Sequence, residues 1–410
     1  MAQIIGTASV GKRPATPPCD LCFARLPLRC SRGVAGSVHK MKLLFWFCFA
    51  SVGYAYVGYA LLLAIYARLR PRPLVKGRIT PTVSIIIAAR NEETNLPAKL
   101  TNISSLEYPP ERIQIVIASD GSTDRTNQIL LEHSGSVVPV ILDHSLGKAS
   151  ALNEAVRRAT GDLLVFLDVR QSVDSTALSE LASCFADSRV GAASGELLLE
   201  TPSGESSETA LGIYWKLEKA VRKLESSTGS VVGVTGAIYA IRRELYVEIP
   251  VGTILDDVFI PMNVVRMSKR VVFEPRAIAR DRIFTSKGKE FSRKVRTLSG
   301  NYQLLRLAPW LLSPANPLLF RFVSHKLLRL LVPLLLTGML AASLLIAEEF
   351  YRILFSLQLF FYGLAALGSL NPSARRFRVI AIPNTFVMLN AAAATALYNY
   401  IRGRDGLWIA

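Results

Sequence analysis

The sequence predicts an α/β fold with a doubly wound, mostly parallel sheet, joined to one N-terminal and about three C-terminal transmembrane helices. Between residues 80 and 305, short β-branched apolar runs alternate with helical patterns, as in parallel sheets with crossover helices. The run LLVFLD, 163–168, is apolar up to its last residue, which is typical of a strand buried on both faces. Long charge-free runs near both ends predict the membrane helices.

Polar motifs follow the predicted strands at the points where the strands end. Strands are expected at 83–89, 113–120, 137–143 and 163–168, and helices from about Leu96, after Thr123-Asp124, and over 151–159. Open α/β sheets bind their ligands outside the carboxyl ends of the strands. The motifs at these ends are therefore candidates for a binding site.

Composition excludes several classes of protein. Net charge is +17 and half of the residues are apolar, but the basic residues flank hydrophobic runs, which favours acidic lipid headgroups and a phosphate-bearing ligand over nucleic acid. Five cysteines do not form a disulfide framework, and the single CxxC at Cys19 and Cys22 has no second pair for a zinc site. His133, His144 and His325 lack metal-ligand spacing, so we expect them to be structural.

The ends of the chain are expected to lie in or near a membrane. Residues 1–40 are predicted to be a disordered leader, with translation beginning at Met41, and residues 41–68 a transmembrane helix. A basic cluster after this helix places the following region in the cytoplasm. Residues 306–329 are predicted to form interfacial helices, 330–401 three transmembrane helices (330–347, 353–374 and 379–401), and 402–410 a tail.

The charges between these helices agree with this orientation except at the end. The acidic pair Glu348 and Glu349 and the basic group at 375–378 alternate as a cytoplasmic middle domain requires. Arg402 and Arg404 conflict with it, because three C-terminal spans would place the tail on the opposite side.

Each polar motif taken alone also has an ordinary structural explanation. ARNEE, 89–93, resembles a helix start with Asn91 as N-cap, and ASDGSTDRT, 118–126, contains common turn residues. Lys148 could be a solvated lysine at a helix start, and Asp256-Asp257 an acid pair favoured by a helix N-terminus. Seven such motifs in one order are far more specific than any of them.

In order, the motifs are ARNEE, SDGSTD, GKASALN, FLD, VTGAIYAIRREL, LDD and RKVR. This series resembles the membrane-bound family 2 glycosyltransferases of GT-A fold, the branch that contains the cellulose, hyaluronan and poly-N-acetylglucosamine synthases. The resemblance covers residues 82 to 305 and the arrangement of the flanking helices.

The resemblance implies a role for each matching residue. Asp257 would be the catalytic base, with Gly236 and Asp256 on the acceptor side. Asp168 would hold the donor with a divalent metal, Mg²⁺ or Mn²⁺. The residues implied around the nucleotide-sugar are Ala88, Arg90, Glu92, Asp120, Lys148, Asp168, Arg170, Arg293 and Arg296.

Two positions depart from the family pattern. Arg170 stands where the family has the second acid of its D-x-D motif, and an arginine pairs with phosphate instead of ligating a metal. Thr297 stands where processive members carry a tryptophan on which the acceptor sugar stacks.

The resemblance implies an inverting transfer of a sugar from a nucleotide-sugar, expected to be a UDP-sugar, to a polysaccharide or lipid-linked acceptor. The protein would be a multi-pass protein of the cell (inner) membrane, in contact with membrane lipids, with its catalytic domain in the cytoplasm and no nucleic acid partner. The alternatives are transfer of one sugar to a membrane lipid, which the missing tryptophan favours, and an inactive nucleotide-sugar-binding membrane protein. Motifs identify neither the sugar nor any protein partner.

Overall fold

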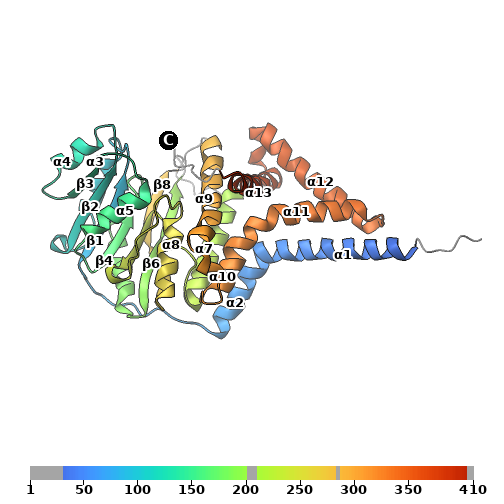
Figure 1. The fold of residues 1–410 in the computed structure, drawn as a ribbon, viewed down its shortest axis with the longest axis horizontal. Coiled ribbons are helices and arrows are strands. Elements are labelled where there is room, and N and C mark those ends of the chain that lie inside the picture. The colour runs from blue at the N-terminus through green and yellow to red at the C-terminus, as the bar shows by residue number, and fades with distance from the viewer. Residues whose placement is uncertain (1–30, 201–209, 283–286, 404–410) are drawn as a thin grey trace, which may run out of the picture.

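The computed structural model describes residues 31–200, 210–282 and 287–403. In these ranges a mixed sheet with helices on both faces forms one domain, and apolar helices extend from one side of it (Figure 1). Most of the predicted leader, 1–30, and the tail beyond 403 lie outside the described residues.

Eight strands in the described part of the chain form one sheet in the order β3-β2-β1-β4-β7-β6-β8-β5. The first four are parallel, β7 is antiparallel to β4 and β6, and β6 pairs in parallel with β8. The order of the strands reverses beside β1, because β2 and β3 lie on one side of it and β4 lies on the other. Open α/β sheets bind their ligands at such a point, outside the carboxyl ends of the strands, here those of β1 and β4. The strands are β1 (Val83–Ala89), β2 (Ile113–Asp120), β3 (Val138–Leu142), β4 (Leu163–Leu167), β5 (Ser172–Val173), β6 (Val190–Glu200), β7 (Ile238–Arg242) and β8 (Arg270–Arg282).

Both faces of the sheet are buried at its centre, which explains why β1 and β4 are apolar along almost their whole length. Ile86 belongs to one hydrophobic cluster, and its neighbours Ile85 and Ile87 belong to the other. The helices of the domain are α3 (Leu96–Ser104), α4 (Thr126–Glu132), α5 (Lys148–Arg157), α6 (Ala177–Ser183), α7 (Ala210–Thr228), α8 (Asp256–Arg266) and α9 (Lys287–Leu307).

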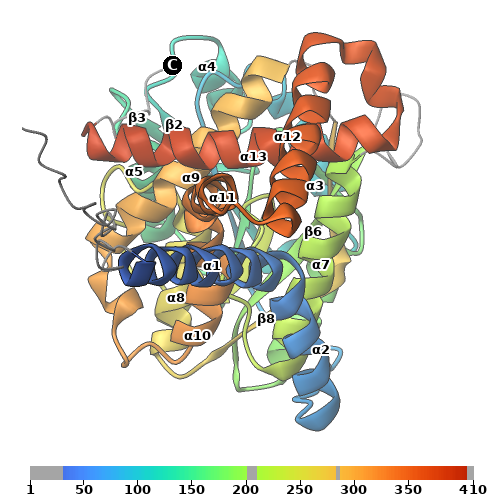
Figure 2. The ribbon, with the colours of Figure 1, turned by 90° about the vertical axis from the view of Figure 1, so that its right-hand side faces the viewer.

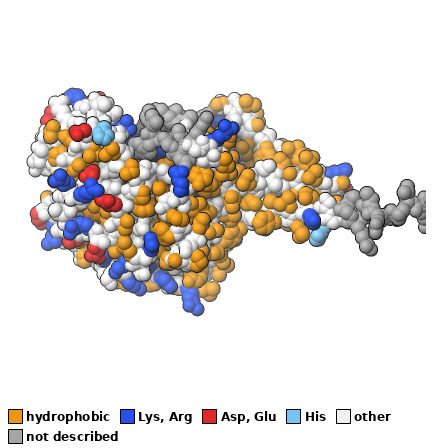
Figure 3. All heavy atoms as spheres, in the orientation of Figure 1, with side chains coloured by type: hydrophobic (Ala, Val, Ile, Leu, Met, Phe, Trp, Pro, Cys, Tyr) orange, Lys and Arg blue, Asp and Glu red, His pale blue; other side chains and the backbone are white. Residues whose placement is uncertain are grey.

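Among the described residues, one N-terminal and three C-terminal helices are long and apolar enough to cross a membrane, as expected. They run over Gly36–Leu69, Leu319–Leu345, Glu349–Leu370 and Arg378–Ile401. Figure 3 shows apolar side chains covering this part of the surface, whereas charged side chains gather on the domain. The elements within them are α1 (Ser31–Gly53), α2 (Tyr59–Leu69), α10 (Leu319–Phe322), α11 (Leu328–Leu345), α12 (Glu349–Leu370) and α13 (Arg378–Ile401).

The boundaries of these helices differ from the expected ones in two places. Residues 31–40 belong to α1, so the described part of the predicted leader is helical and continues into the apolar run. Interfacial helices were predicted over 306–329, but α10 continues through a π-helical turn (Val323–Leu327) into α11, so this apolar helix begins at Leu319 and not at 330. A second π-helical turn (Tyr54–Gly58) joins α1 to α2. Both differences arise because local hydropathy does not show where a helix begins.

Candidate functional site

The two loops that follow β1 and β2 hold one another in place. Asn91 has a positive φ of 53° and its side-chain oxygen accepts a hydrogen bond from the backbone N–H of Thr123, at 2.9 Å. The backbone N–H of Glu92 donates to Thr126 Oγ1, at 2.8 Å. Asn91 is therefore not the N-cap of α3, a position that Asn95 occupies. Ala88, Arg90 and Glu92 lie at this edge, with Arg90 exposed to solvent.

Asp120 ends β2, and its carboxylate is hydrogen-bonded to the loop that precedes α5. Its carboxylate accepts hydrogen bonds from the backbone N–H groups of Leu146 (2.7 Å) and Gly147 (3.0 Å) and from the hydroxyl of Ser145 (2.9 Å). Asp120 is 2% exposed. The structure thus gives this carboxylate three donors from the protein itself, whereas the resemblance implied that Asp120 lies around the nucleotide-sugar.

Lys148 begins α5 and joins acids from two other elements. Its ammonium nitrogen lies 3.0 Å from Asp168 Oδ1, just after β4, and 3.5 Å from Asp256 Oδ2, at the start of α8. Burial alone would lower the pKa of Lys148, but these carboxylates raise it above its usual value. Lys148 therefore stays protonated at the centre of the site.

Asp257 stands beside Asp256 in the first turn of α8, where a helix N-terminus favours acids. Burial, together with the charge of Asp256, raises the pKa of Asp257 to about 6. Nearby cations oppose this rise, and Lys326 has the largest opposing effect. A Cβ on Gly236 would lie 3.7 Å from Asp257 Oδ2, so this glycine adjoins the carboxylate. Such a carboxylate is suited to accept a proton near neutral pH.

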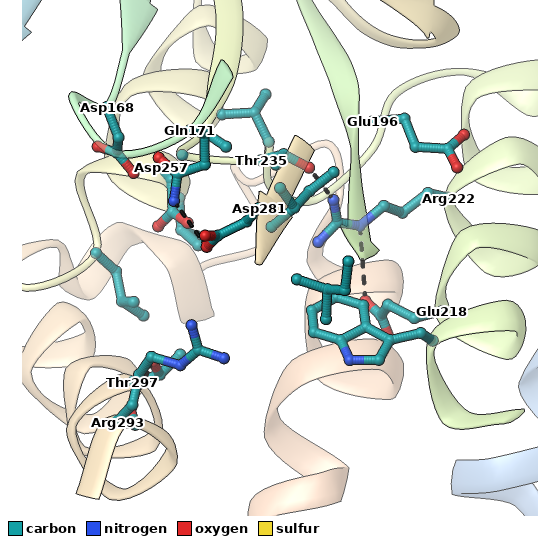
Figure 4. Close-up of a pocket in the computed structure, with 18 of the residues that line it drawn as sticks. Asp168, Gln171, Glu196, Glu218, Arg222, Thr235, Asp257, Asp281, Arg293 and Thr297 are labelled. Atoms are coloured by element: carbon teal, nitrogen blue, oxygen red, sulfur yellow. Dashed lines mark hydrogen bonds and ion pairs between the residues drawn. The ribbon is translucent and has the colours of Figure 1, made fainter. Parts of the chain in front are cut away.

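One pocket of about 580 Å³ brings most of the predicted residues together (Figure 4). Ala88, Arg90, Glu92 and Asp120 are not among its lining residues, although β1 and β2 end at the same edge as β4. Predicted site residues that line it are Lys148, Asp168, Arg170, Gly236, Asp256, Asp257, Arg293 and Arg296.

Arg170 has a structural partner that the sequence did not indicate. Its guanidinium donates to Asp281 Oδ2 at 2.6 Å, and the amide of Gln171 donates to the same oxygen at 3.1 Å. Asp281 lies near the end of β8 and is 5% exposed. The cation that replaces the second acid of the D-x-D motif thus neutralises a buried carboxylate at the edge of the pocket.

The pocket extends beyond the motifs to α7 and to the second apolar helix, Leu319–Leu345. Trp215 and Arg222 come from α7, and Lys326 comes from the π-helical turn that joins α10 to α11. Arg222 donates to Thr235 Oγ1 and lies 3.8 Å from Glu218. No local motif marked these residues, because they belong to stretches whose pattern predicts only an amphipathic helix or a membrane helix.

A divalent metal fits this site only together with a ligand. Among residues 31–200, 210–282 and 287–403, no group of three or more His, Cys, Asp or Glu side chains could hold a metal ion. Asp168 offers one carboxylate, and Mg²⁺ is commonly bound by one or two carboxylates, phosphate oxygens and water. Asp168 with the oxygens of a diphosphate is consistent with that coordination.

Comparison with known proteins identifies the family of the domain. Residues 84–249 match the model of the family described as glycosyl transferase family 2. Over 229 residues the chain is 24% identical to the poly-beta-1,6-N-acetyl-D-glucosamine synthase of Staphylococcus aureus, covering 54% of this chain and 55% of that protein. The synthase of the same name from Staphylococcus epidermidis is 23% identical, covering 56% of each chain. The match thus spans about half the length of these curated relatives.

A solved structure resembles the chain over a larger part. The mannosyltransferase PcManGT from Pyrobaculum calidifontis, solved in complex with GDP-Man and Mn²⁺, covers 89% of this chain and 99% of its own, with a TM-score of 0.65. Its sequence identity is 21%, so the likeness shows a shared fold.

Proposed function

This chain carries a glycosyl transferase family 2 domain of GT-A fold, and from that premise we propose that it is an inverting glycosyltransferase acting at a membrane. It would move a sugar from a nucleotide-sugar to a polysaccharide or lipid-linked acceptor. The main support is that Asp257 shares one pocket with Lys148 and Asp168, so that a base and groups for a phosphate lie within reach of one substrate.

In the proposed reaction, Asp257 takes the proton of the acceptor hydroxyl. The acceptor oxygen forms a bond to the anomeric carbon while the bond from that carbon to the diphosphate oxygen breaks. The anomeric configuration inverts because there is one displacement. The diphosphate leaves as an anion and needs charge neutralisation more than a proton.

We assign the donor side to the cations around Asp168. Lys148, Arg293 and Arg296 would neutralise the diphosphate, and Asp168 would hold Mg²⁺ or Mn²⁺ against it. The metal would supply further positive charge there. Ala88, Arg90 and Glu92 would contact the nucleoside, expected to be uridine, at the neighbouring strand ends. Asp120 would act there chiefly by holding the loop before Lys148.

We assign the acceptor side to the part of the pocket beyond Asp257. Gly236 and Asp256 adjoin the base, and the ring of Trp215, which has Lys294 Nζ 5.0 Å from its centroid, adds an aromatic side chain to the lining. Trp215 would thus take the role of the tryptophan that processive members carry at the position of Thr297, which favours a sugar chain as acceptor. The names of the curated relatives favour the same acceptor. Transfer to a membrane lipid is the second candidate, because Lys326 brings the pocket to the base of an apolar helix.

Four apolar helices and membrane-associated relatives indicate a membrane protein. We propose the cell (inner) membrane, with the domain in the cytoplasm where nucleotide-sugars are made. The basic residues after α2 support this orientation.

Sugar transfer by the purified full chain, reconstituted into lipid vesicles, tests the proposal. A panel of radiolabelled nucleotide-sugars, each with Mg²⁺ or Mn²⁺, should give one donor that labels product, and a ladder of products would indicate a polymer. Asp257→Asn should lower the transfer rate about 10²- to 10⁴-fold with donor affinity retained. Glu111→Gln, an exposed neutralisation outside the pocket, is the matched control.

Two results would contradict the proposal. If no nucleotide-sugar binds or donates, the protein is not a glycosyltransferase. If Asp257→Asn transfers at the wild-type rate, another group is the base.

Binding of the donor tests the metal separately from activity. Calorimetric affinity for UDP should fall several-fold when EDTA removes the metal, and Asp168→Asn should abolish the difference between the two conditions. Equal affinity with and without metal in the wild-type chain would exclude this role of Asp168.

A further inference from the structure

We propose that α13 lies along the membrane surface, on the same side as the catalytic domain, and does not cross the bilayer. α13 is as long and apolar as a spanning helix. Its partner would be the headgroup region of an acidic lipid bilayer. The inference does not depend on which reaction the domain performs.

The strongest observation is that the second half of α13 is packed on α9. Val295 of α9 is buried together with Ala392 and Ala396 of α13. Further along, the rings of Tyr302 and Tyr400 stack with their centroids 5.2 Å apart. The last turns of α13 therefore lie against the catalytic domain.

α9 is not a membrane helix. Five of its polar side chains line the pocket, and Arg293 and Arg296 among them are exposed. Charged side chains are costly in hydrocarbon, and α9 is not among the described helices that are long and apolar enough to cross a membrane. The part of α13 that packs on α9 must also lie outside the hydrocarbon.

The remaining part of α13 is too short to cross. Setting aside the portion from Ala392 onward leaves about 14 residues, or roughly 21 Å of helix. The hydrocarbon core is about 30 Å thick and needs about 20 helical residues.

The orientation of α13 agrees with this estimate. Figure 1 looks almost along the axis of α13, and Figure 2 shows the helix extending across the view. By contrast, α11 extends across the view in Figure 1 and is seen almost end-on in Figure 2. The two helices therefore run in very different directions, and α11 and α13 cannot both follow the membrane normal.

Contacts with the first apolar helix indicate the depth of α13 relative to the membrane. Asn390 donates to the hydroxyl of Tyr56, and the rings of Tyr56 and Phe386 are 5.3 Å apart. Tyr56 lies in the π-helical turn beyond which α2 packs on α7, where Tyr59 is buried with Val221. α13 thus meets the N-terminal helix where that helix joins the catalytic domain.

The in-plane position removes the conflict between the charges and the orientation. Arg378 and Arg402, at the two ends of α13, then lie on the same side as the basic residues after α2. The acidic end of the α11–α12 pair lies on the other side, where Glu348 pairs with Lys42 of α1. Basic groups at both ends suit the attraction to acidic headgroups. In this position α13 would hold α9, and with it Arg293 and Arg296, at a fixed depth below the membrane.

Labelling of single cysteines in sealed vesicles tests the proposal. In the full chain with its five cysteines replaced, Ser373→Cys lies before α13 and Arg402→Cys lies after it. Glu111→Cys reports the side of the catalytic domain, and Glu349→Cys the opposite end of the α11–α12 pair. Right-side-out and inverted vesicles are treated with a maleimide that cannot cross the membrane.

We expect the thiols at 373, 402 and 111 to be labelled in the same vesicle preparation and the thiol at 349 in the other. Labelling of Arg402→Cys together with Glu349→Cys would show that α13 spans, and would overturn the proposal. A protease-cleavable tag placed after Ala410 gives a second measurement of the same side. Its cleavage only in the preparation that exposes Glu111→Cys supports the proposal, and its cleavage only in the other overturns it.

Discussion

At the level of single residues, the site depends on how charges of opposite sign are distributed. Lys148 joins Asp168 and Asp256, while Asp257 lies in the same pocket with its pKa raised to about 6. Lys326, from the base of an apolar helix, opposes that rise. The protonation of the proposed base is thus adjusted from the membrane side of the domain.

The transfer rate should therefore follow the deprotonated form of Asp257. Because this carboxylate must be ionised to accept a proton, kcat should fall as the pH drops below about 6 and level off above about 7. Lys326→Gln removes an opposing positive charge, so the pKa of Asp257 should rise and the acidic limb should move to higher pH.

Profiles of kcat against pH for both proteins measure this shift. Lys269→Gln is the matched control, because Lys269 bonds to Ser188 outside the pocket. An unchanged acidic limb in Lys326→Gln would mean that Lys326 does not act on the base.

At the level of elements, the site is built from loops that fix one another. The carboxylate at the end of β2 binds the loop that leads into α5, and α5 begins with Lys148. Gly121 allows the close contact, because a Cβ there would lie 2.4 Å from the backbone nitrogen of Ser145. The position of Lys148 beside Asp168, which follows β4, thus depends on β2, two strands away from β4 in the sheet.

Asp120→Ala should consequently loosen this loop. It removes the acceptor of the Leu146 and Gly147 N–H groups, at a cost of about 1–3 kcal/mol. We expect a lower melting temperature in detergent and a higher KM for the donor. Ser145→Ala removes only a hydroxyl bond and should have a smaller effect on both measurements. Equal effects of the two variants would contradict this role of Asp120.

At the level of the whole molecule, a buried ionic cluster joins the domain to the apolar helices. His325, at the base of α11, lies 2.9 Å from Glu218 and 2.9 Å from Glu225, both on α7. Tyr59 of α2 donates to the same oxygen of Glu225 at 2.7 Å. Three segments far apart in sequence therefore meet around two buried carboxylates, and His325 has the structural role that was expected of it.

Removing the histidine should weaken this junction. His325→Leu leaves both glutamates without their shared partner, and breaking a buried pair costs about 3–5 kcal/mol. The melting temperature of the full chain in detergent should fall, and the double variant with Glu225→Gln should recover part of the loss. A double variant less stable than His325→Leu would show that the charge of Glu225 is needed for other reasons. His133→Leu, on the catalytic domain and away from the cluster, is the control.

From the sequence alone we predicted the parallel half of the sheet, the four apolar helices and eight of the residues that line the pocket. Strands buried on both faces are apolar throughout, and the motifs that follow them, such as the one ending in Asp168, must meet at one edge. The tertiary structure decided which partners those residues have. Arg170 meets Asp281, Asp120 meets the loop before Lys148, and Trp215 and Lys326 enter the pocket from helices without a motif. It also decided the direction of α13, because hydropathy measures how apolar a helix is but not which neighbour covers it.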